Sequence, residues 1–465
     1  MIEYSKKTGS PPENNIQAHD NTDTFISKLK THYNKSQENG KPYLNSYAFT
    51  GLAGEFVGLV KPHTEADPVG ILIQFITIFG ALIGRTMRFV VGATRHHGNL
   101  FTVLVGRTSK ARKGTSLNIC NMLFEKAFPE WFKANLKSGL SSGEGLIYAI
   151  RDPVEIIEQP GKRRDFIVDQ GVEDKRLLIV EEEFAQPLKI MNRDGNILST
   201  TIRNAWDSKD LSILTKNNPT KASSPHIAII AHITIKELKK YLSEIEAANG
   251  FGNRFCYFYV ERSQNLPLPK DLSLFDYSKV IERLRAAVSF SQKKAVVKMD
   301  EKAEKIWCVV YSRLVESTDN MVGYLTARAE SQVLRFALVF AVLDCNSVVK
   351  KKHLLAALAL WEYSEASCRY IFGDAIGDSA ADMILAELKK HPQGLTKTEI
   401  QRNVFKNNKP KQELKRAYDV LFSQGLAYPK LDPGDQIRSP ERWFAVNSES
   451  TTFTNYTTFA DEGLS

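Results

Sequence analysis

Cysteine is scarce in this chain, and the few cysteines do not gather into a motif. The 465 residues include five cysteines, with no Cys-x-x-Cys pair and no cysteine at ligand spacing from a histidine. An odd number of widely spaced thiols inside apolar segments argues against disulfides and zinc, and it indicates buried free thiols in a reducing compartment. The first fifteen residues also lack the apolar core of a secretory signal. We therefore expect a cytoplasmic protein.

Long uncharged apolar runs are nearly absent as well, and the exception is the segment from Pro68 to Gly84. It carries no charge, so a membrane span is one interpretation. The segment is shorter than the ~20 residues that a spanning helix needs, and it contains Gln74, Thr77 and three glycines. We predict a fully buried helix packed on the core, and no membrane partner.

Acidic residues are the smaller charged group, with 53 Asp and Glu against 62 Lys and Arg and a net charge of +9. That balance suits a polyanionic partner, although scattered lysines also keep proteins soluble. Hydrophobic residues make up 43% and charged residues 25%, which is ordinary for a globular protein with a sizeable core. At roughly 100–200 residues per domain, the length allows two or three domains.

The stretch from Phe101 to Ser116 has the layout of a phosphate-binding loop. A β-branched apolar run ends in a glycine, a basic loop follows, and a helical pattern then begins. In such a loop, backbone N–H groups and a lysine meet phosphate oxygens, and a hydroxyl ligates Mg²⁺. Lys113 precedes Gly114 here, the reverse of the usual order, so a plain basic turn is the alternative. Thr115 is the expected Mg²⁺ ligand, with Ser116 second. The residues expected around the nucleotide are Gly106, Arg112, Lys113, Gly114, Thr115 and Ser116.

Three glutamates follow a buried strand later in the chain. The apolar run Leu177–Val180 is followed directly by Glu181, Glu182 and Glu183. Carboxylates at the carboxyl edge of a parallel sheet lie beside a phosphate loop, where they can hold Mg²⁺ and activate water. We assign the metal to Glu181 and the attacking water to Glu182, with the assignment open by one position. A solvated acidic run at a strand end is the alternative.

Two further polar positions stand at ends of apolar strands. The run from His226 to Thr234 predicts a buried strand that ends in the polar residues His232 and Thr234. These side chains would contact the γ-phosphate or the attacking water. The alternative is that neighbouring backbone groups satisfy the hydrogen bonds of these strand-end residues. Arg254 follows a glycine-rich turn, which suits an arginine that reaches another subunit's γ-phosphate. A structural arginine paired with the acidic cluster is the alternative.

The C-terminal pattern is three helices followed by a hairpin, which is typical of a winged helix. Thr396 and Glu399 are spaced as a capping box for the second helix. Basic residues on or before the third helix are expected to contact DNA phosphates, namely Lys409, Lys411, Lys415 and Arg416. A protein–protein module is the alternative.

Together these patterns predict an α/β protein with a P-loop NTPase core of the RecA or AAA type, flanking helical segments and a C-terminal winged-helix domain. The expected division is a disordered leader at 1–22, an N-terminal helical region at 23–98, the ATPase core at 99–270, a helical subdomain at 271–375, a winged helix at 380–447 and a disordered tail at 448–465.

The order of these motifs resembles the YfjI-like P-loop ATPases of phages, plasmids and integrated elements, which accompany primase-polymerase modules and are usually described as helicases. The matching segments are GRTSKARKGTS, SGLSSGEGLI, LLIVEEEFA, IAIIAHIT and GFGNRF, within roughly residues 45–370. The resemblance implies a homo-oligomeric ring, with a hexamer as one size, that uses ATP and Mg²⁺ and acts on single-stranded or forked DNA. No primase-polymerase module is visible in the chain, so a separate primase or polymerase is the expected partner.

The function expected from the sequence is an ATP-dependent DNA helicase or translocase in the replication of a mobile genetic element. One alternative is a nucleotide-dependent DNA-binding switch, such as an initiator, a loader or a defence regulator. Another is a degenerate ATPase that serves as an adaptor with little unwinding, which the reversed order of Lys113 and Gly114 permits.

Overall fold

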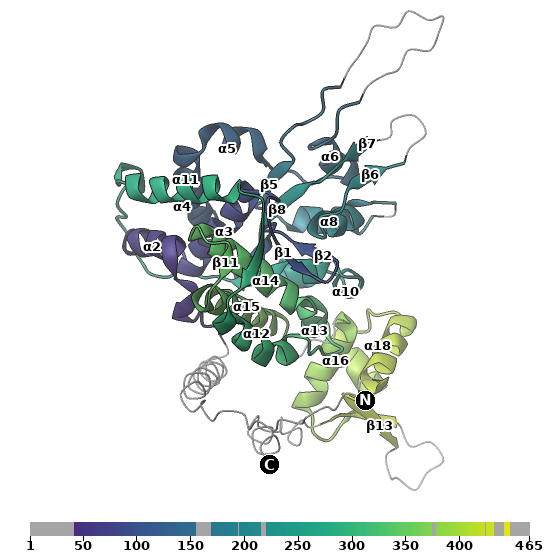
Figure 1. Ribbon diagram of the computed structural model, residues 1–465. Coiled ribbons are helices and arrows are strands. Elements are labelled where there is room, and N and C mark those ends of the chain that lie inside the picture. The colour runs from purple at the N-terminus through teal and green to yellow at the C-terminus, as the bar shows by residue number, and fades with distance from the viewer. Residues whose placement is uncertain are drawn as a thin grey trace, which may run out of the picture. The chain divides into compact units, whose positions relative to one another are not determined.

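The computed structural model describes residues 41–154, 169–193, 195–214, 220–373, 378–423, 425–431 and 441–446. The expected leader at 1–22 and tail at 448–465 lie outside the described residues. The chain forms two compact units, a larger one that ends at Gly373 and a smaller C-terminal one. The larger unit is a mixed α/β structure built on a parallel sheet (Figure 1).

The central sheet of the larger unit has five strands, and every neighbouring pair is parallel. Parallel strands need crossover connections, so all five carboxyl ends lie at one edge of the sheet. The register places Gly106 beside Thr234 and Glu181 beside Ala231. In spatial order the strands are β4 (Leu136–Lys137), β5 (Arg176–Glu181), β8 (His226–Thr234), β3 (Phe101–Gly106) and β9 (Cys256–Tyr259).

Helices and a short hairpin connect these strands. Strand β9 stands at the edge of the sheet, and two of its N–H groups donate to the hydroxyls of Ser364 and Ser367, which close that edge. The connecting elements are α4 (Lys113–Ala127), α5 (Pro129–Asn135), α6 (Gly143–Tyr148), α7 (Ala185–Met191), α8 (Leu198–Trp206), β6 (Leu211–Ile213), β7 (Thr220–Ala222), α9 (Ile235–Tyr241) and α10 (Glu244–Ala248).

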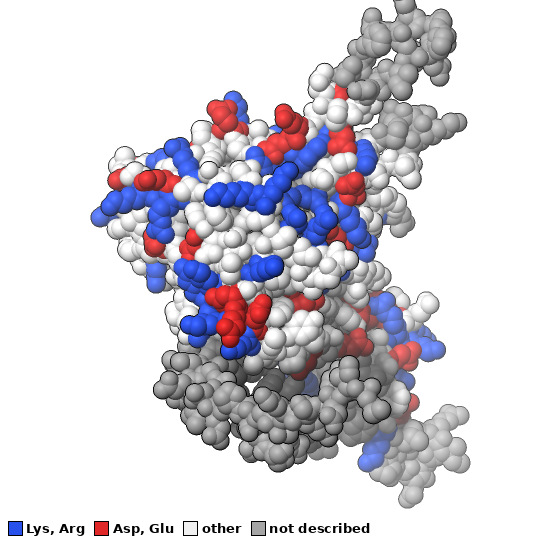
Figure 2. All heavy atoms as spheres, in the orientation of Figure 1, with Lys and Arg blue, Asp and Glu red and all other residues white. Residues whose placement is uncertain are grey.

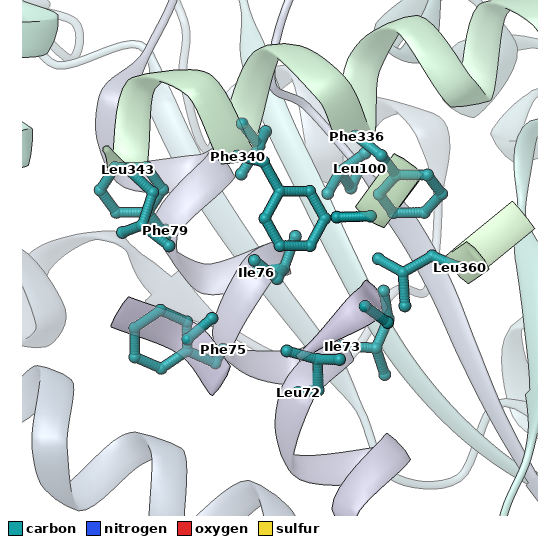
Figure 3. Packing of buried hydrophobic residues seen from close by; sticks show 14 of the residues in the cluster. Leu72, Ile73, Phe75, Ile76, Phe79, Leu100, Phe336, Phe340, Leu343 and Leu360 are labelled. Atoms are coloured by element: carbon teal, nitrogen blue, oxygen red, sulfur yellow. The ribbon is translucent and has the colours of Figure 1, made fainter. Parts of the chain in front are cut away.

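The apolar segment is helix α3 (Pro68–Ile83), and every residue from Val69 to Ile83 is buried, as predicted. Asp67 caps its start, proline occupies the first turn, and Gly84 ends it with φ 65°. None of the helices in the described part of the chain has the length and apolar character to cross a membrane. Figure 3 shows α3 residues packed against Leu100 and against helices α14 (Ala329–Leu343) and α15 (Lys351–Phe372), through Phe336, Phe340, Leu343 and Leu360.

A second sheet joins segments that lie far apart in the sequence. Strand β1 (Met87–Val91) pairs in parallel with β10 (Ala295–Met299) and antiparallel with β2 (Thr94–His96), and β11 (Val348–Val349) completes the sheet. The residues before the phosphate-loop candidate therefore share a sheet with residues after the central sheet. The other α-helices that the structure describes in this unit are α2 (Gly51–Val60), α11 (Ser278–Ser291), α12 (Glu301–Leu314) and α13 (Met321–Thr326).

The smaller unit packs three helices on an antiparallel sheet of order β12-β14-β13. Its core includes Ile384, Leu421 and Trp443, and the capping box of Thr396 and Glu399 is present as predicted. The tip of its hairpin lies outside the described residues. The elements are α16 (Ser379–Lys390), β12 (Leu395–Thr396), α17 (Lys397–Phe405), α18 (Lys411–Ser423), β13 (Ala427–Leu431) and β14 (Glu441–Ala445).

Candidate functional site

The loop between β3 and α4 folds so that the Lys113 amine returns to the end of the strand. Arg112 adopts the left-handed conformation with φ 56°, and helix α4 begins at Lys113. The Lys113 Nζ atom lies 3.2 Å from the position that a Cβ would take on Gly106, and that Cβ would be 2.6 Å from the Cβ of Ala111. A side chain at Gly106 would therefore displace Ala111 and crowd the amine. The lysine covers the strand end although it precedes Gly114.

The Lys113 ammonium is partly desolvated and makes no direct ion pair in the described part of the chain. Burial lowers its pKa, and the carboxylates of Glu237 and Glu183 oppose that shift. The other expected cation is engaged elsewhere, because the guanidinium of Arg112 pairs with Glu65 at 2.6 Å. Lys113 is thus the cation that the loop itself directs to the carboxyl edge of the sheet.

The two candidate hydroxyls differ in what surrounds them. Thr115 is exposed in the first turn of α4. Ser116 is buried; its Oγ donates to the Lys113 carbonyl at 2.7 Å and accepts from the Gln74 amide at 2.6 Å. Thr115 therefore offers the accessible hydroxyl, and Ser116 holds the helix start in place.

The three glutamates face different surroundings. Glu181 is buried, its Oε1 accepts the N–H of Leu140 at 2.7 Å, and desolvation raises its pKa. The Glu182 carboxylate is 60% exposed, and its Oε2 lies 3.1 Å from where a Cβ on Gly114 would stand. Strand β5 ends at Glu181 and Glu182 begins a turn, so the two side chains have different surroundings. The carboxylate beside the start of α4 is therefore that of Glu182. From the sequence, we had expected Glu181 to hold the metal.

His232 lies behind Glu182 in a buried polar network. Its Nε2 is 3.0 Å from Gln74 Oε1, and its Nδ1 is 3.9 Å from Glu182 Oε2. The Gln74 amide nitrogen donates to the Gly70 carbonyl and to Ser116 Oγ, so its Oε1 is left as the acceptor. The proton of His232 is accordingly on Nε2, and the lone pair of Nδ1 faces Glu182. Burial and the charge of Lys113 lower the pKa of His232 to about 3, which keeps the ring neutral.

Gln74 was not among the residues expected at the site. Its side chain comes from the buried helix α3 and joins β8 to the first turn of α4. The available signal was a single amide in an otherwise apolar segment, because a buried amide needs partners. The sequence reveals the Gln74 amide but not its hydrogen-bond partners.

Thr234 lies at the same edge but is occupied as a helix cap. Its Oγ1 donates to Glu237 Oε2 at 2.8 Å and accepts the Glu237 N–H at 3.2 Å, which forms a capping box at the start of α9. This arrangement is the satisfied strand end that the sequence left as the alternative. Of the two polar residues at the end of β8, only His232 meets the acidic cluster.

Arg254 is buried, whereas the sequence predicted an exposed arginine on the turn. Its guanidinium pairs with Asp207 at 2.8 Å and also donates to the carbonyls of Arg203 and Gly250. The acid is Asp207, which lies far from the glutamate cluster in the sequence. Because Arg254 precedes β9, it lies at the amino edge of the central sheet, opposite the edge that carries Lys113.

In the smaller unit, two of the four expected DNA contacts are ion-paired within the unit. Lys409 pairs with Glu413, and Arg416 pairs with Asp378 at 2.8 Å. Lys411 and Lys415 are exposed on α18. These two lysines therefore remain as the candidates for phosphate contacts.

At the start of α4, Thr115 offers a hydroxyl and Glu182 offers a carboxylate, which are oxygen groups that could contribute to a Mg²⁺ site. Mg²⁺ typically takes one or two protein oxygens together with phosphate oxygens and waters. Within the described residues, no group of three or more His, Cys, Asp and Glu side chains could hold a metal ion by itself. Comparison with known proteins adds no relative: no protein-family model matches the chain, and no curated protein matches it.

Proposed function

We propose that the larger unit binds ATP with Mg²⁺ at the carboxyl edge of its central sheet and hydrolyses it. The observation that carries this proposal is the Lys113 amine folded over the end of β3 at the edge where Glu182 meets the first turn of α4. Strand β8 lies between β3 and β5, so its polar end lies between the lysine and the acids. Anionic phosphates suit this place because the amides of a helix start point toward it.

We assign the following roles to the residues at this edge. Lys113 and the N–H groups of the first turn of α4 bind the phosphates. Thr115 and Glu182 would hold Mg²⁺, which would supply positive charge for the phosphoryl oxygens. Glu183, whose charge acts on Lys113, orients and deprotonates the attacking water. This assignment moves both acidic roles one position along the chain from the sequence expectation, and it gives Glu181 a structural role.

The loop supplies its own matched control for this proposal. Lys113→Ala is expected to abolish nucleotide binding and turnover, whereas Lys110→Ala removes an exposed lysine of the same loop and should leave both unchanged. Binding of a fluorescent ATP analogue and release of phosphate measure the two effects. Full turnover by the Lys113→Ala variant would show that this edge is not the nucleotide site.

We further propose that hydrolysis drives movement along DNA or its unwinding. The net charge of +9 supports a polyanionic partner, and Figure 2 shows many basic side chains, with acidic ones among them, on one face of the larger unit. The smaller unit has the order helix, strand, helix, helix and two strands, which suits a winged helix with α18 as its DNA-facing helix. ATP turnover should then rise when single-stranded DNA is added, and a forked duplex should be separated.

One observation favours a second function, a nucleotide-dependent DNA-binding switch. Arg254 is buried and paired with Asp207 inside its own subunit, so another subunit's phosphates could reach it only after that pair opens. A protein that keeps this arrangement would turn over slowly. Nucleotide-dependent DNA binding without strand separation supports the switch, and DNA-stimulated turnover with strand separation supports the helicase.

A further inference from the structure

A hollow lies on a part of the larger unit that the proposed ATP site does not use. Its volume is about 910 Å³, and strands β1, β2 and β10, helices α12 and α14 and the end of α8 form its walls. Arg335 lines it and donates to the carbonyl of Asn99, just before β3 begins. The hollow is therefore near the amino edge of the central sheet, across the sheet from Lys113.

One wall of the hollow presents aromatic rings. Trp307 and Tyr311 are one turn apart on α12, with ring centroids 5.7 Å apart and an interplanar angle of 59°. Tyr311 is 44% exposed, and Trp307 is half-buried. Trp206 lines the same hollow, and its indole N–H is buried without a partner among the described residues. Aromatic rings that line a hollow and reach solvent suit a planar ligand that can stack.

The sheet wall carries cations among apolar side chains. Arg95 on β2 is paired with Val90 on β1. On the other side of β1, Val297 on β10 is paired with Phe89, so Lys298 lies beside Val90. The two cations therefore flank Val90. Neither cation forms an ion pair within the described part of the chain. The charged residues that line the hollow are the cations Arg95, Lys209, Lys298, Arg328 and Arg335 and the acids Asp207, Glu304 and Glu330.

The floor of the hollow holds a buried positive charge. The Arg335 guanidinium is fully buried, yet it donates only to neutral oxygens, those of Asn99 and Trp206, and its Nε has no partner in the described residues. It stacks 3.7 Å from the centre of the Trp206 ring. The charge of Asp207 acts on Arg335, but Asp207 is paired with Arg254 at 2.8 Å and so serves both arginines. A buried charge that shares its counter-charge with another arginine favours an anion nearby.

We propose that this hollow binds a single-stranded nucleic acid, with bases against Trp307 and Tyr311 and phosphates along Lys298 and Arg95. Stacking on rings combined with a cationic wall is the recognition mode of proteins that bind single strands without sequence preference. A duplex keeps its base faces inside its own stack, so it cannot use the rings. The inference is separate from the proposed ATP site and does not require hydrolysis.

The test is binding of a fluorescein-labelled oligo-dT to the full chain without nucleotide, followed by anisotropy over a range of salt. Tyr311→Ala and Lys298→Glu should each weaken binding about tenfold, and Lys298→Glu should also reduce the salt slope by about 0.7. Lys305→Glu is the matched control, because Lys305 is exposed on α12 outside the hollow, and it should bind normally. In a background with both Lys411→Glu and Lys415→Glu, which removes the duplex contact proposed for α18, a duplex of the same length should bind more weakly than oligo-dT.

Thermal unfolding checks that the variants are folded, and Tyr311→Phe, which keeps a ring, should restore binding in a folded background. Oligo-dT affinity that stays unchanged in Tyr311→Ala and Lys298→Glu would overturn the proposal. So would a change in native mass of these variants without a change in oligo-dT affinity, because the hollow would then be a contact between copies of the chain. The ATP site is tested separately by Lys113→Ala, which should leave nucleotide-free binding of oligo-dT intact.

Discussion

Replacing Gln74 by methionine should destabilise the larger unit through its polar network and not through its packing. Methionine has nearly the same volume as glutamine, so no sizeable cavity forms in α3. The substitution leaves the His232 Nε2–H without an acceptor in a buried site. It also removes one donor to Ser116 Oγ, which keeps its bond to the Lys113 carbonyl.

The expected loss of unfolding free energy follows from these two groups. A buried donor left unsatisfied costs about 1–3 kcal/mol, and the lost bond to the serine hydroxyl adds about 1 kcal/mol. We therefore expect Gln74→Met to cost about 2–4 kcal/mol in urea unfolding followed by tryptophan fluorescence and circular dichroism. Turnover of ATP should fall as well, because His232 loses the partner that orients its Nδ1 toward Glu182.

A double substitution separates this cause from others. If the orphaned N–H of His232 carries the cost, replacing both partners, as in Gln74→Met with His232→Leu, should cost at least about 1 kcal/mol less than the sum of the two single changes. Thr77→Val, one turn along α3, is a control that removes a hydroxyl outside this network. A cost below about 0.5 kcal/mol for Gln74→Met, or strict additivity in the double variant, would refute the reasoning.

Three further predictions concern other groups. Glu183→Gln should keep ATP binding but reduce turnover at least 100-fold, within the ~10²–10⁴ range of general base catalysis, whereas Glu181→Gln should keep turnover. A single-turnover assay distinguishes the two variants. The opposite pattern would support the assignment made from the sequence, in which Glu181 holds the metal and Glu182 activates the water. Charge reversal of both Lys411 and Lys415 should weaken duplex DNA binding in an anisotropy assay. Charge reversal of Lys389 and Lys390 on α16 is the control. If the two double variants bind duplex DNA with equal affinity, α18 is not part of the DNA interface. As the pH is lowered from about 6.5 to about 4, the free energy of unfolding should fall because the unfolded state binds more protons than the folded state. Each buried histidine should contribute a loss of about 2 kcal/mol near pH 5. Urea midpoints measure this loss, and midpoints that do not change with pH would contradict it. The groups responsible are histidines whose pKa burial lowers to about 4 or about 3, namely His96, His97, His226 and His232.

Acids with raised pKa values oppose part of that pH effect. Burial raises the pKa of Asp67 to about 6 and that of Glu362 to about 7, so each of these groups adds stability as the pH falls through those values. The histidines are the larger group, so the net change should follow them. A variant such as Glu362→Gln should steepen the loss of stability on the acid side.

The sequence was informative where a pattern is local. The apolar run before Glu181, the run that ends at Thr234 and the capping box of Thr396 all have a period or a composition that a short window contains. The buried character of α3 could be predicted for the same reason. These elements follow from their own residues, because burial on both faces of a strand and the needs of a helix start act within a few positions.

The remaining features depend on contacts between distant segments. Three identical glutamates in a row give no local sign of which side chain faces α4, and only the folded turn after β5 places Glu182 there. The partner of Arg254, Asp207, lies on the connection after α8, so the sequence could suggest an ion pair but not this acid. The pairing of β1 with β10 is equally non-local, and both strands line the hollow.

That pairing has a consequence for how the protein is made. Helix α3 and strand β1 leave the ribosome early, but β10 and the helices α14 and α15 that cover α3 are synthesised much later. Until then the most apolar segment of the chain has no complete cover, and a long loop must close before native contacts form. Nascent chains that stop before α14 should therefore associate with chaperones and aggregate when released, whereas chains extended past Phe372 should become resistant to protease.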